Sequence, residues 1–203
     1  MSHTRWEDPD GRWAITVPAT WERRLQSSDF GTTDAIFFVT PPADPEHWEE
    51  DPVADAFTVG VMPGVTPAEV IDMWRYLLGE GGVAEPVSQG SRSLAGQHAD
   101  ETVFDGAVAG AARRVRMVCT AVGGALYMVM HGTAPERYAA QEPQVTAALD
   151  SFELLPGSAF APAVRADPDA EAGAADAAGT EPSEQPHEGI GHRLGSLFHR
   201  RGR

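Results

Sequence analysis

The chain has 203 residues, 42% of them hydrophobic and 22% charged, so it is long enough for one sizeable core and one domain is expected. It carries 30 acids against 15 bases, a net charge of −15, and every base is arginine. This charge excludes general nucleic-acid binding by the body of the protein, because the phosphate backbone would be repelled. The lysine-free composition resembles that encoded by high-GC bacterial genomes, such as actinobacterial ones.

Neither end of the chain nor its interior suggests export or insertion into a membrane. Residues 1–10 are polar and acidic, whereas a signal peptide has a basic end and an apolar run. No stretch approaches the ~20 apolar residues that span a bilayer. We therefore expect a cytoplasmic protein, and a monomer or a weak dimer.

The single cysteine, Cys119, excludes an internal disulfide and leaves no thiolate cluster for zinc. It lies in phase with Val115 and Met117, which predicts a buried and inert thiol. The histidines are scattered, so we expect no metal site and no cofactor.

Composition divides the chain into three parts. Residues 1–155 carry 23 acids and 10 arginines and contain nearly all the large apolar residues. Residues 156–188 are built mainly from Ala, Pro, Gly, Asp, Glu and Ser, which predicts a disordered acidic linker. Residues 189–203, GIGHRLGSLFHRRGR, contain four arginines and no acid. This basic tip can fold back onto the acidic body or reach outward.

The first strands are expected at residues 12–17, where Pro18 ends the ladder, and at 34–40. Phe57, Val59 and Val61 alternate with smaller or polar residues, which predicts a half-buried strand. Thr66 and Glu69 form a predicted capping box at the start of a helix that ends near Gly79.

A run of β segments follows, at residues 83–94, 97–104, 113–122 and 125–131, and its last two strands are joined by a tight turn at Gly123-Gly124. A second capping box, Thr133 to Glu136, predicts a terminal helix with a break or restart at Pro143. Hairpin-linked strands with two helices predict an α+β domain, an antiparallel β-sheet flanked by helices.

The opening strand followed by Pro18 and Trp21, the capped central helix, the Arg-rich late strand and the closing Asp150-Ser151-Phe152 resemble the PsbP-like superfamily. This superfamily includes PsbP, the Ran-binding Mog protein, DcrB and the actinobacterial LpqN lipoproteins. The resemblance covers most of residues 8–155 and implies a PsbP-like antiparallel sheet in an accessory or binding factor.

No nucleophile elbow, phosphate-binding loop or zinc-protease motif is present, so we expect no enzymatic activity. Arg114 and Arg116 share one strand face, either as an anchoring patch for an acidic partner or, the reading we favour, in cross-strand pairs with acids such as Asp100 or Glu101. Trp48, in the acidic loop 41–52, either anchors an interface or caps the core.

The tail has the most pronounced pattern. Its apolar residues follow a helical spacing, so they would share one face of a helix, and its arginines would lie on the other faces. This pattern favours a basic amphipathic helix that forms when the tail contacts a partner or a membrane. The candidate contact residues are Ile190, Arg193, Leu194, Leu197, Phe198 and Arg200. We expect an adaptor or accessory protein that binds a protein partner through its α+β domain and its tail. The alternatives are a peripheral protein held on an anionic inner membrane surface by the tail, and a small-ligand binder.

Overall fold

The computed structural model describes residues 2–28, 30–42, 54–79, 83–108 and 110–158, and it confirms the α+β class with antiparallel sheets. In chain order the elements are β1 (His3–Glu7), β2 (Trp13–Pro18), β3 (Glu22–Ser27), β4 (Thr33–Phe38), β5 (Ala56–Pro63), α1 (Pro67–Leu78), β6 (Pro86–Leu94), β7 (Gln97–Val108), β8 (Ala111–Val122), β9 (Ala125–Thr133), α2 (Pro135–Asp150), β10 (Glu153–Leu154) and the short 3₁₀ helix η2 (Pro156–Ser158).

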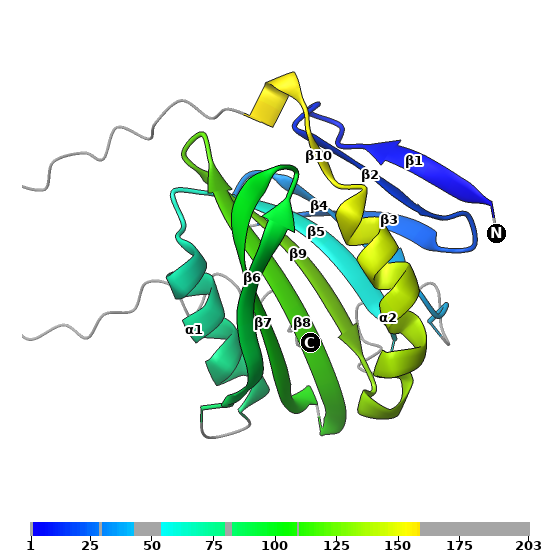
Figure 1. The fold of residues 1–203 in the computed structure, drawn as a ribbon, viewed down its shortest axis with the longest axis vertical. Coiled ribbons are helices and arrows are strands. Elements are labelled where there is room, and N and C mark those ends of the chain that lie inside the picture. The colour runs from blue at the N-terminus through cyan, green and yellow to red at the C-terminus, as the bar shows by residue number, and fades with distance from the viewer. Residues whose placement is uncertain (1, 29, 43–53, 80–82, 109, 159–203) are drawn as a thin grey trace, which may run out of the picture.

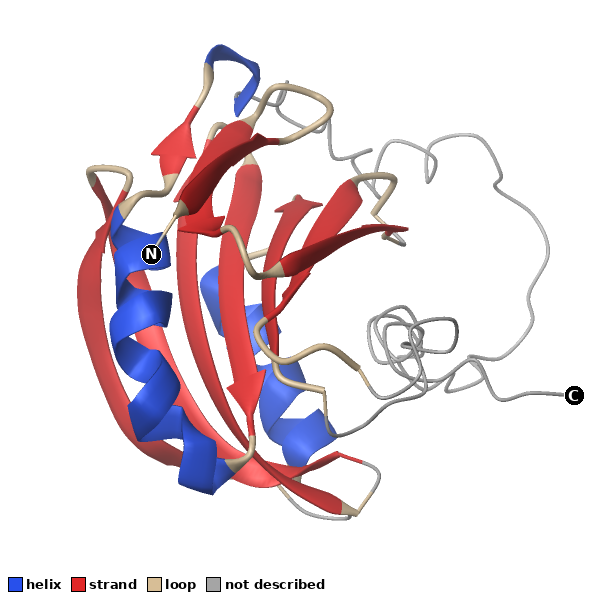
Figure 2. Ribbon diagram, turned by 90° about the vertical axis from the view of Figure 1, so that its right-hand side faces the viewer, coloured by secondary structure: helices blue, strands red, loops and turns tan. Residues whose placement is uncertain are grey.

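A seven-stranded antiparallel sheet, in the order β3-β4-β5-β9-β8-β7-β6, forms the centre of the domain (Figure 1). A smaller sheet, in the order β1-β2-β10, packs with α2 over one face of it. Helix α1 covers part of the opposite face, where it contacts β7 and β8. Figure 2 shows the two helices on opposite sides of the curved sheet.

Both faces of the large sheet are therefore buried at β5, and the expectation of a half-buried strand there is wrong. Phe57, Val59 and Val61 face α2 and the small sheet, while Met62 faces the α1 side. β5 pairs with both β4 and β9, so it lies inside the sheet. The small and polar residues that alternate along β5 mark a second packed face and not a solvated one.

The expected capping box of α1 is present. The Glu69 amide donates to Thr66 Oγ1, and the Glu69 carboxylate accepts from the Thr66 amide at 2.8 Å. Val70, Trp74 and Leu78 then recur every fourth residue and are buried against the sheet. The cap fixes the start of the helix, and this apolar row fixes the face that it buries.

The two-residue strand β10 was not expected, and neither were the longer strands β1 and β3. Both lie at sheet edges and are rich in charged residues, so neither shows the apolar alternation that marks a half-buried strand. They are joined by a contact in which the Arg23 guanidinium lies 3.9 Å from the centroid of the Trp6 ring. Trp6 is partly buried and packs against the core.

The Gly123-Gly124 hairpin is confirmed, with φ angles of 59° and 82° that suit glycine. The second capping box and the break at Pro143 are wrong. Thr133 is the last residue of β9, the cap position is Ala134, and no side chain caps the helix. α2 runs through Pro143 because that proline lies on the exposed side, while Val145, Ala148 and Leu149 are buried against the sheet.

Ordered contacts continue three residues past the expected domain end at residue 155. The Leu155 amide donates to the Arg12 carbonyl, and the Gly157 amide donates to the Gly11 carbonyl. The Tyr127 hydroxyl donates to the Ser158 carbonyl at 2.6 Å. Within the described residues, neither helix is long and apolar enough to cross a membrane.

Gly106 on β7 lets the end of α1 approach the sheet. A Cβ at this position would lie 2.5 Å from the Leu78 carbonyl oxygen and 2.6 Å from the Leu78 Cβ. We expect Gly106→Ala to lower the free energy of unfolding by about 1–3 kcal/mol, because the helix backbone must shift. Gly90→Ala is the control, since a Cβ there meets nothing within 4 Å. Equal urea midpoints for the two variants would refute this role of Gly106.

Candidate functional site

An open groove of about 470 Å³ lies between the β6 edge of the large sheet and α2. Its lining comes from three neighbouring strands and the helix: Val87, Ser88, Gln89, Gly90, Glu101, Val103, Arg114, Arg116, Tyr138 and Glu142. The groove therefore contains Arg114 and Arg116, the two domain arginines singled out from the sequence. Cross-strand pairing places Glu101, Val103 and Arg116 on the face that α2 covers.

Arg114 forms a two-pronged ion pair with Asp105, its direct cross-strand neighbour. Its Nε donates to one carboxylate oxygen at 2.6 Å and its Nη2 to the other at 2.5 Å. This pair lowers the pKa of Asp105, chiefly through the hydrogen bonds from Arg114. The guanidinium also lies 5.5 Å from the centroid of the Tyr138 ring. Arg114 is thus already neutralised by its own sheet.

Arg116 is buried and is likewise occupied. Its Nε donates to the Glu101 carboxylate, and its Nη1 donates to Thr146 Oγ1 on α2 at 3.1 Å. The favoured expectation of cross-strand pairing is met by Glu101, whereas Asp100 lies opposite Cys119 and pairs with neither arginine. The two arginines build the wall of the groove and leave no free positive patch for an acidic partner.

Two polar groups of the groove that are not held in ion pairs lie on α2. Among the described residues, no hydrogen bond or ion pair engages the exposed Glu142 carboxylate or the Tyr138 hydroxyl. Burial raises the pKa of Tyr138, so its hydroxyl stays protonated and able to donate. The groove thus offers one free carboxylate, one free hydroxyl and the half-exposed Val87 side chain, 54% accessible.

The groove is bordered by a strand edge. In the described sheet β6 pairs only with β7, so the backbone groups on its outer side are not used by a neighbouring strand. A register shift between Pro86 and Ser88 leaves Val87 bulged out of the ladder. Gly90 has no side chain over the groove, and a Cβ there would meet open space.

Beneath α2, the fully buried Asp55 joins four segments of the chain. Its carboxylate accepts from Arg137 Nε and Nη2, both at 2.8 Å, from Gln141 Nε2 at 2.7 Å and from Thr40 Oγ1 at 3.0 Å. Arg113 Nη1 lies 3.7 Å away. Burial favours a raised pKa for Asp55, but these hydrogen bonds outweigh it and lower the pKa, so the carboxylate is ionised.

The ionised Asp55 fixes the orientation of its neighbours. Because it accepts the Gln141 amide, the Gln141 carbonyl oxygen faces His131 Nε2, 2.9 Å away. His131 Nε2 must therefore carry the hydrogen, and Nδ1 is a bare, buried acceptor. Burial is the main reason that the pKa of His131 falls to about 4, with Arg116 and Arg113 adding to the effect.

The structure does not place the other predicted site residues. Trp48 and the tail residues Ile190, Arg193, Leu194, Leu197, Phe198 and Arg200 lie outside the described residues, so their roles stay predictions. Cys119 is buried in the apolar cluster on the α1 side, and burial raises its pKa to about 12. No cluster of three His, Cys, Asp or Glu side chains suited to a metal ion occurs in the described part of the chain.

Sequence reasoning missed Asp55, Asp105, Tyr138 and Glu142. Of these four residues, only Asp105 could have been found from the sequence. It lies close to one predicted strand and Arg114 lies on the next, and an acid and an arginine on neighbouring strands are candidates for a cross-strand pair. Tyr138 and Glu142 are four residues apart and so share one side of α2. That spacing marks a common surface of the helix without showing that the surface borders a groove.

Comparison with protein-family models and with curated proteins gives no match. Solved structures do match. Cyanobacterial PsbP (CyanoP) from Synechocystis sp. PCC 6803 is 16% identical, with a TM-score of 0.50 over 75% of this chain and 92% of that chain. The Ran-binding protein Mog1p of Saccharomyces cerevisiae is 10% identical, with a TM-score of 0.52 over 79% of this chain and 100% of that chain.

A third match, LpqN of Mycobacterium tuberculosis, involved in cell envelope biogenesis, is 19% identical, with a TM-score of 0.45 over 76% of this chain and 91% of that chain. At these identities the similarity concerns the fold alone. The chain has the PsbP-like fold, as the order of its motifs led us to expect.

The buried, neutral His131 makes stability depend on pH. In the unfolded chain this histidine binds a proton below its ordinary pKa of about 6.5, whereas in the folded chain it resists protonation down to about 4. Its contribution to the free energy of unfolding is therefore complete above pH 6.5 and is lost as the pH falls toward 4.

We expect urea unfolding to show the wild type losing up to about 1.4 kcal/mol per pH unit over this window relative to His131→Gln, which has no group to protonate. Parallel pH profiles for the two proteins would contradict the assignment of a buried neutral imidazole.

Proposed function

We propose that this protein is a non-catalytic accessory or adaptor protein that binds a partner protein through the groove between β6 and α2. The proposal is carried by the combination of an open groove, an unpaired strand edge along it and unengaged polar groups on its far wall. One solved protein of this fold, Mog1p, is described as Ran-binding, which supports a role in protein binding.

The shape of the groove favours an extended segment of a partner over a small molecule. Pockets for small ligands are mostly apolar and enclose most of their ligand. Here Val87, Ser88, Gln89 and Gly90 are all exposed along one side, and Glu142 is exposed on the other. An extended peptide can use such a site, because its backbone pairs with the strand edge and alternate side chains enter the groove.

The charges in the groove favour a basic partner segment. Asp105 and Glu101 already neutralise Arg114 and Arg116, so the charge left over belongs to Glu142. An arginine or lysine of the partner can pair with Glu142 and place its stem along the Tyr138 ring. This is the reverse of an anchoring patch for an acidic partner.

The arrangement does not suggest catalysis. The groove's arginines are held in ion pairs, and the carboxylate that remains, that of Glu142, is exposed to water. The cytoplasmic location, and the tail's use as a second contact with a partner or an anionic membrane, remain predictions.

Filling the groove tests the proposal. A Gly90→Leu side chain enters open space over the groove, so it should block the site without disturbing the fold. Linear peptides selected for binding from a random library should be enriched in arginine or lysine. They should lose about tenfold or more in affinity for Gly90→Leu, a change of about 1.4 kcal/mol.

The matched control is Ser91→Leu, the next residue of β6, which is exposed on the opposite face of the sheet. It should bind the selected peptides as the wild type does. Peptides that bind Gly90→Leu and Ser91→Leu equally well would show that binding occurs elsewhere.

A further inference from the structure

Two buried acceptor oxygens without a donor lie next to each other at the far edge of the sheet. Gln26 on β3 is the direct cross-strand partner of Asp34 on β4, so both side chains project from the same face. Gln26 Oε1 and Asp34 Oδ1 are each buried, and neither has a hydrogen-bond partner among the residues that the structure describes. Buried polar atoms are nearly always paired, so two adjacent acceptors without a donor point to a missing group.

Of the two side chains, Asp34 is the more deeply buried and the one that can carry a charge. Its side chain is 95% inaccessible, since only 5% of the residue is exposed. It leans over β5 at Gly60, where a Cβ would lie 3.2 Å from Oδ1. Burial raises the pKa of Asp34 to about 7, although the Val61 backbone and the Arg12 charge act to lower it. The carboxylate therefore lacks the counter-charge that Asp55 has.

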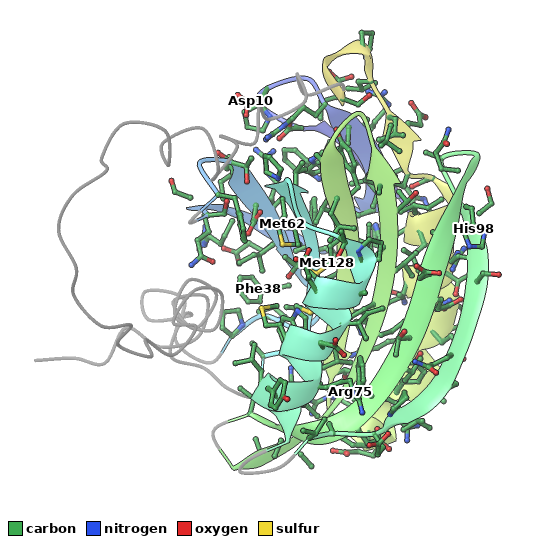
Figure 3. The ribbon with its side chains drawn as sticks, turned by 90° about the vertical axis from the view of Figure 1, so that its left-hand side faces the viewer. Asp10, Phe38, Met62, Arg75, His98 and Met128 are labelled. Atoms are coloured by element: carbon green, nitrogen blue, oxygen red, sulfur yellow. The ribbon has the colours of Figure 1, made fainter. Side chains whose placement is uncertain are left out.

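The Asp34–Gln26 pair lies on the face of the sheet against which α1 packs, near the β3 edge. Gly60 pairs across the sheet with Met128, which lies beside Met62 next to α1 in Figure 3. The most extensive contacts of α1 are with β7 and β8, farther along the sheet, while Met62 and Met128 belong to the same apolar cluster as the buried residues of the helix. Gln26 is only partly buried as a residue and β3 is the outermost strand, so the buried acceptor pair lies next to the sheet edge.

The missing group should be a cation with several N–H donors. A guanidinium has five donors and a delocalised charge, so one group can serve both a carboxylate and an amide oxygen. All ten arginines of the described residues already contact a carboxylate, a carbonyl oxygen or an aromatic ring. The chain has no lysine, and its remaining arginines are Arg165 and the four of the tail.

We propose that the Asp34–Gln26 pair is the docking site for an arginine of the chain's own C-terminal tail, residues 189–203. The tail carries four arginines and no acid, so its charge complements an unpaired carboxylate. Thirty residues separate Ser158 from the tail and can span roughly 100 Å when extended, so reach is not limiting.

This site lies on the face opposite to the β6–α2 groove. A docked tail therefore leaves the groove open to a partner protein. It also means that any contact of the tail with a partner or a membrane competes with Asp34. The proposal stands independently of the groove, since it rests on different residues of another face.

The first test is the titration of Asp34, followed through its side-chain carboxyl carbon by NMR in the full-length protein. In a variant with Arg193, Arg200, Arg201 and Arg203 all changed to Ala, the pKa of Asp34 should be about 7. In the wild type it should be lower by roughly one to three pH units, because a guanidinium favours the charged form. Arg165→Ala, in the linker, is the control and should titrate as the wild type does.

Two outcomes would overturn the proposal. Equal, high pKa values in the wild type and the tail variant would mean that no cation docks at Asp34. Equal, low values in both would mean that the donor comes from elsewhere than the tail.

A second test measures proximity directly. Because Cys119 is buried, a cysteine introduced by Ser196→Cys can be spin-labelled selectively. The label should broaden the amide signals of Gln26 and Asp34 at least twofold more than those of β7. Asp34→Asn should abolish this broadening, whereas Asp100→Asn, on the same sheet, should retain it. Broadening that is absent from the wild type, or that persists in Asp34→Asn, would refute the docking.

Discussion

The buried carboxylate of Asp55 is the interaction on which the shape of the binding face depends. It joins the end of β4 through Thr40, the start of β5 through its own backbone, β8 through Arg113 and α2 through Arg137 and Gln141. A buried charge is tolerated only when it is fully paired, so these segments must come together as a set. The position of α2 over the sheet, and hence the far wall of the groove, follows from it.

The two faces of the large sheet differ in whether their buried acidic side chains are paired with arginines. On the α2 side the carboxylates of Asp55, Asp105 and Glu101 are each held by an arginine, and the pairs of Arg114 and Arg116 line the groove. On the α1 side the buried Asp34 forms no ion pair with any of the described residues, and its Oδ1 has no hydrogen-bond partner among them. The first pattern supports the proposal of a groove for a partner, and the second supports the proposal of a docking site for an arginine of the tail.

Local sequence patterns predicted most of the secondary structure. The capping box of α1, the glycine hairpin between β8 and β9 and the order of strands are all local signals, and they survive in the fold. The edge strands β1 and β3 were missed because charged residues at sheet edges carry no apolar alternation. Pro143 was misjudged because the packing of α2 on the sheet outweighs the loss of one hydrogen bond.

The groove and the Asp55 cluster were harder to predict, because they depend on contacts between residues that are far apart in the sequence. Glu101 was recognised as a partner for an arginine from its place on a neighbouring strand, but the register that pairs Asp105 with Arg114 is set by the turn between β7 and β8. Asp55 is one of several acids in an acidic stretch, and nothing local distinguishes it. Only the convergence of Arg113, Arg137 and Gln141 identifies it as the buried one.

The central claim, that Asp55 holds α2 on the sheet, is tested most directly by amide hydrogen exchange along α2 in Asp55→Asn. Loss of the buried charge removes the ion pair that ties Arg137 of α2 to Asp55, so the α2 amides should exchange about a hundredfold faster than in the wild type, while those of α1 change little. Asp105→Asn, which breaks an exposed pair, should leave α2 protected. Unchanged protection of α2 in Asp55→Asn would contradict the account.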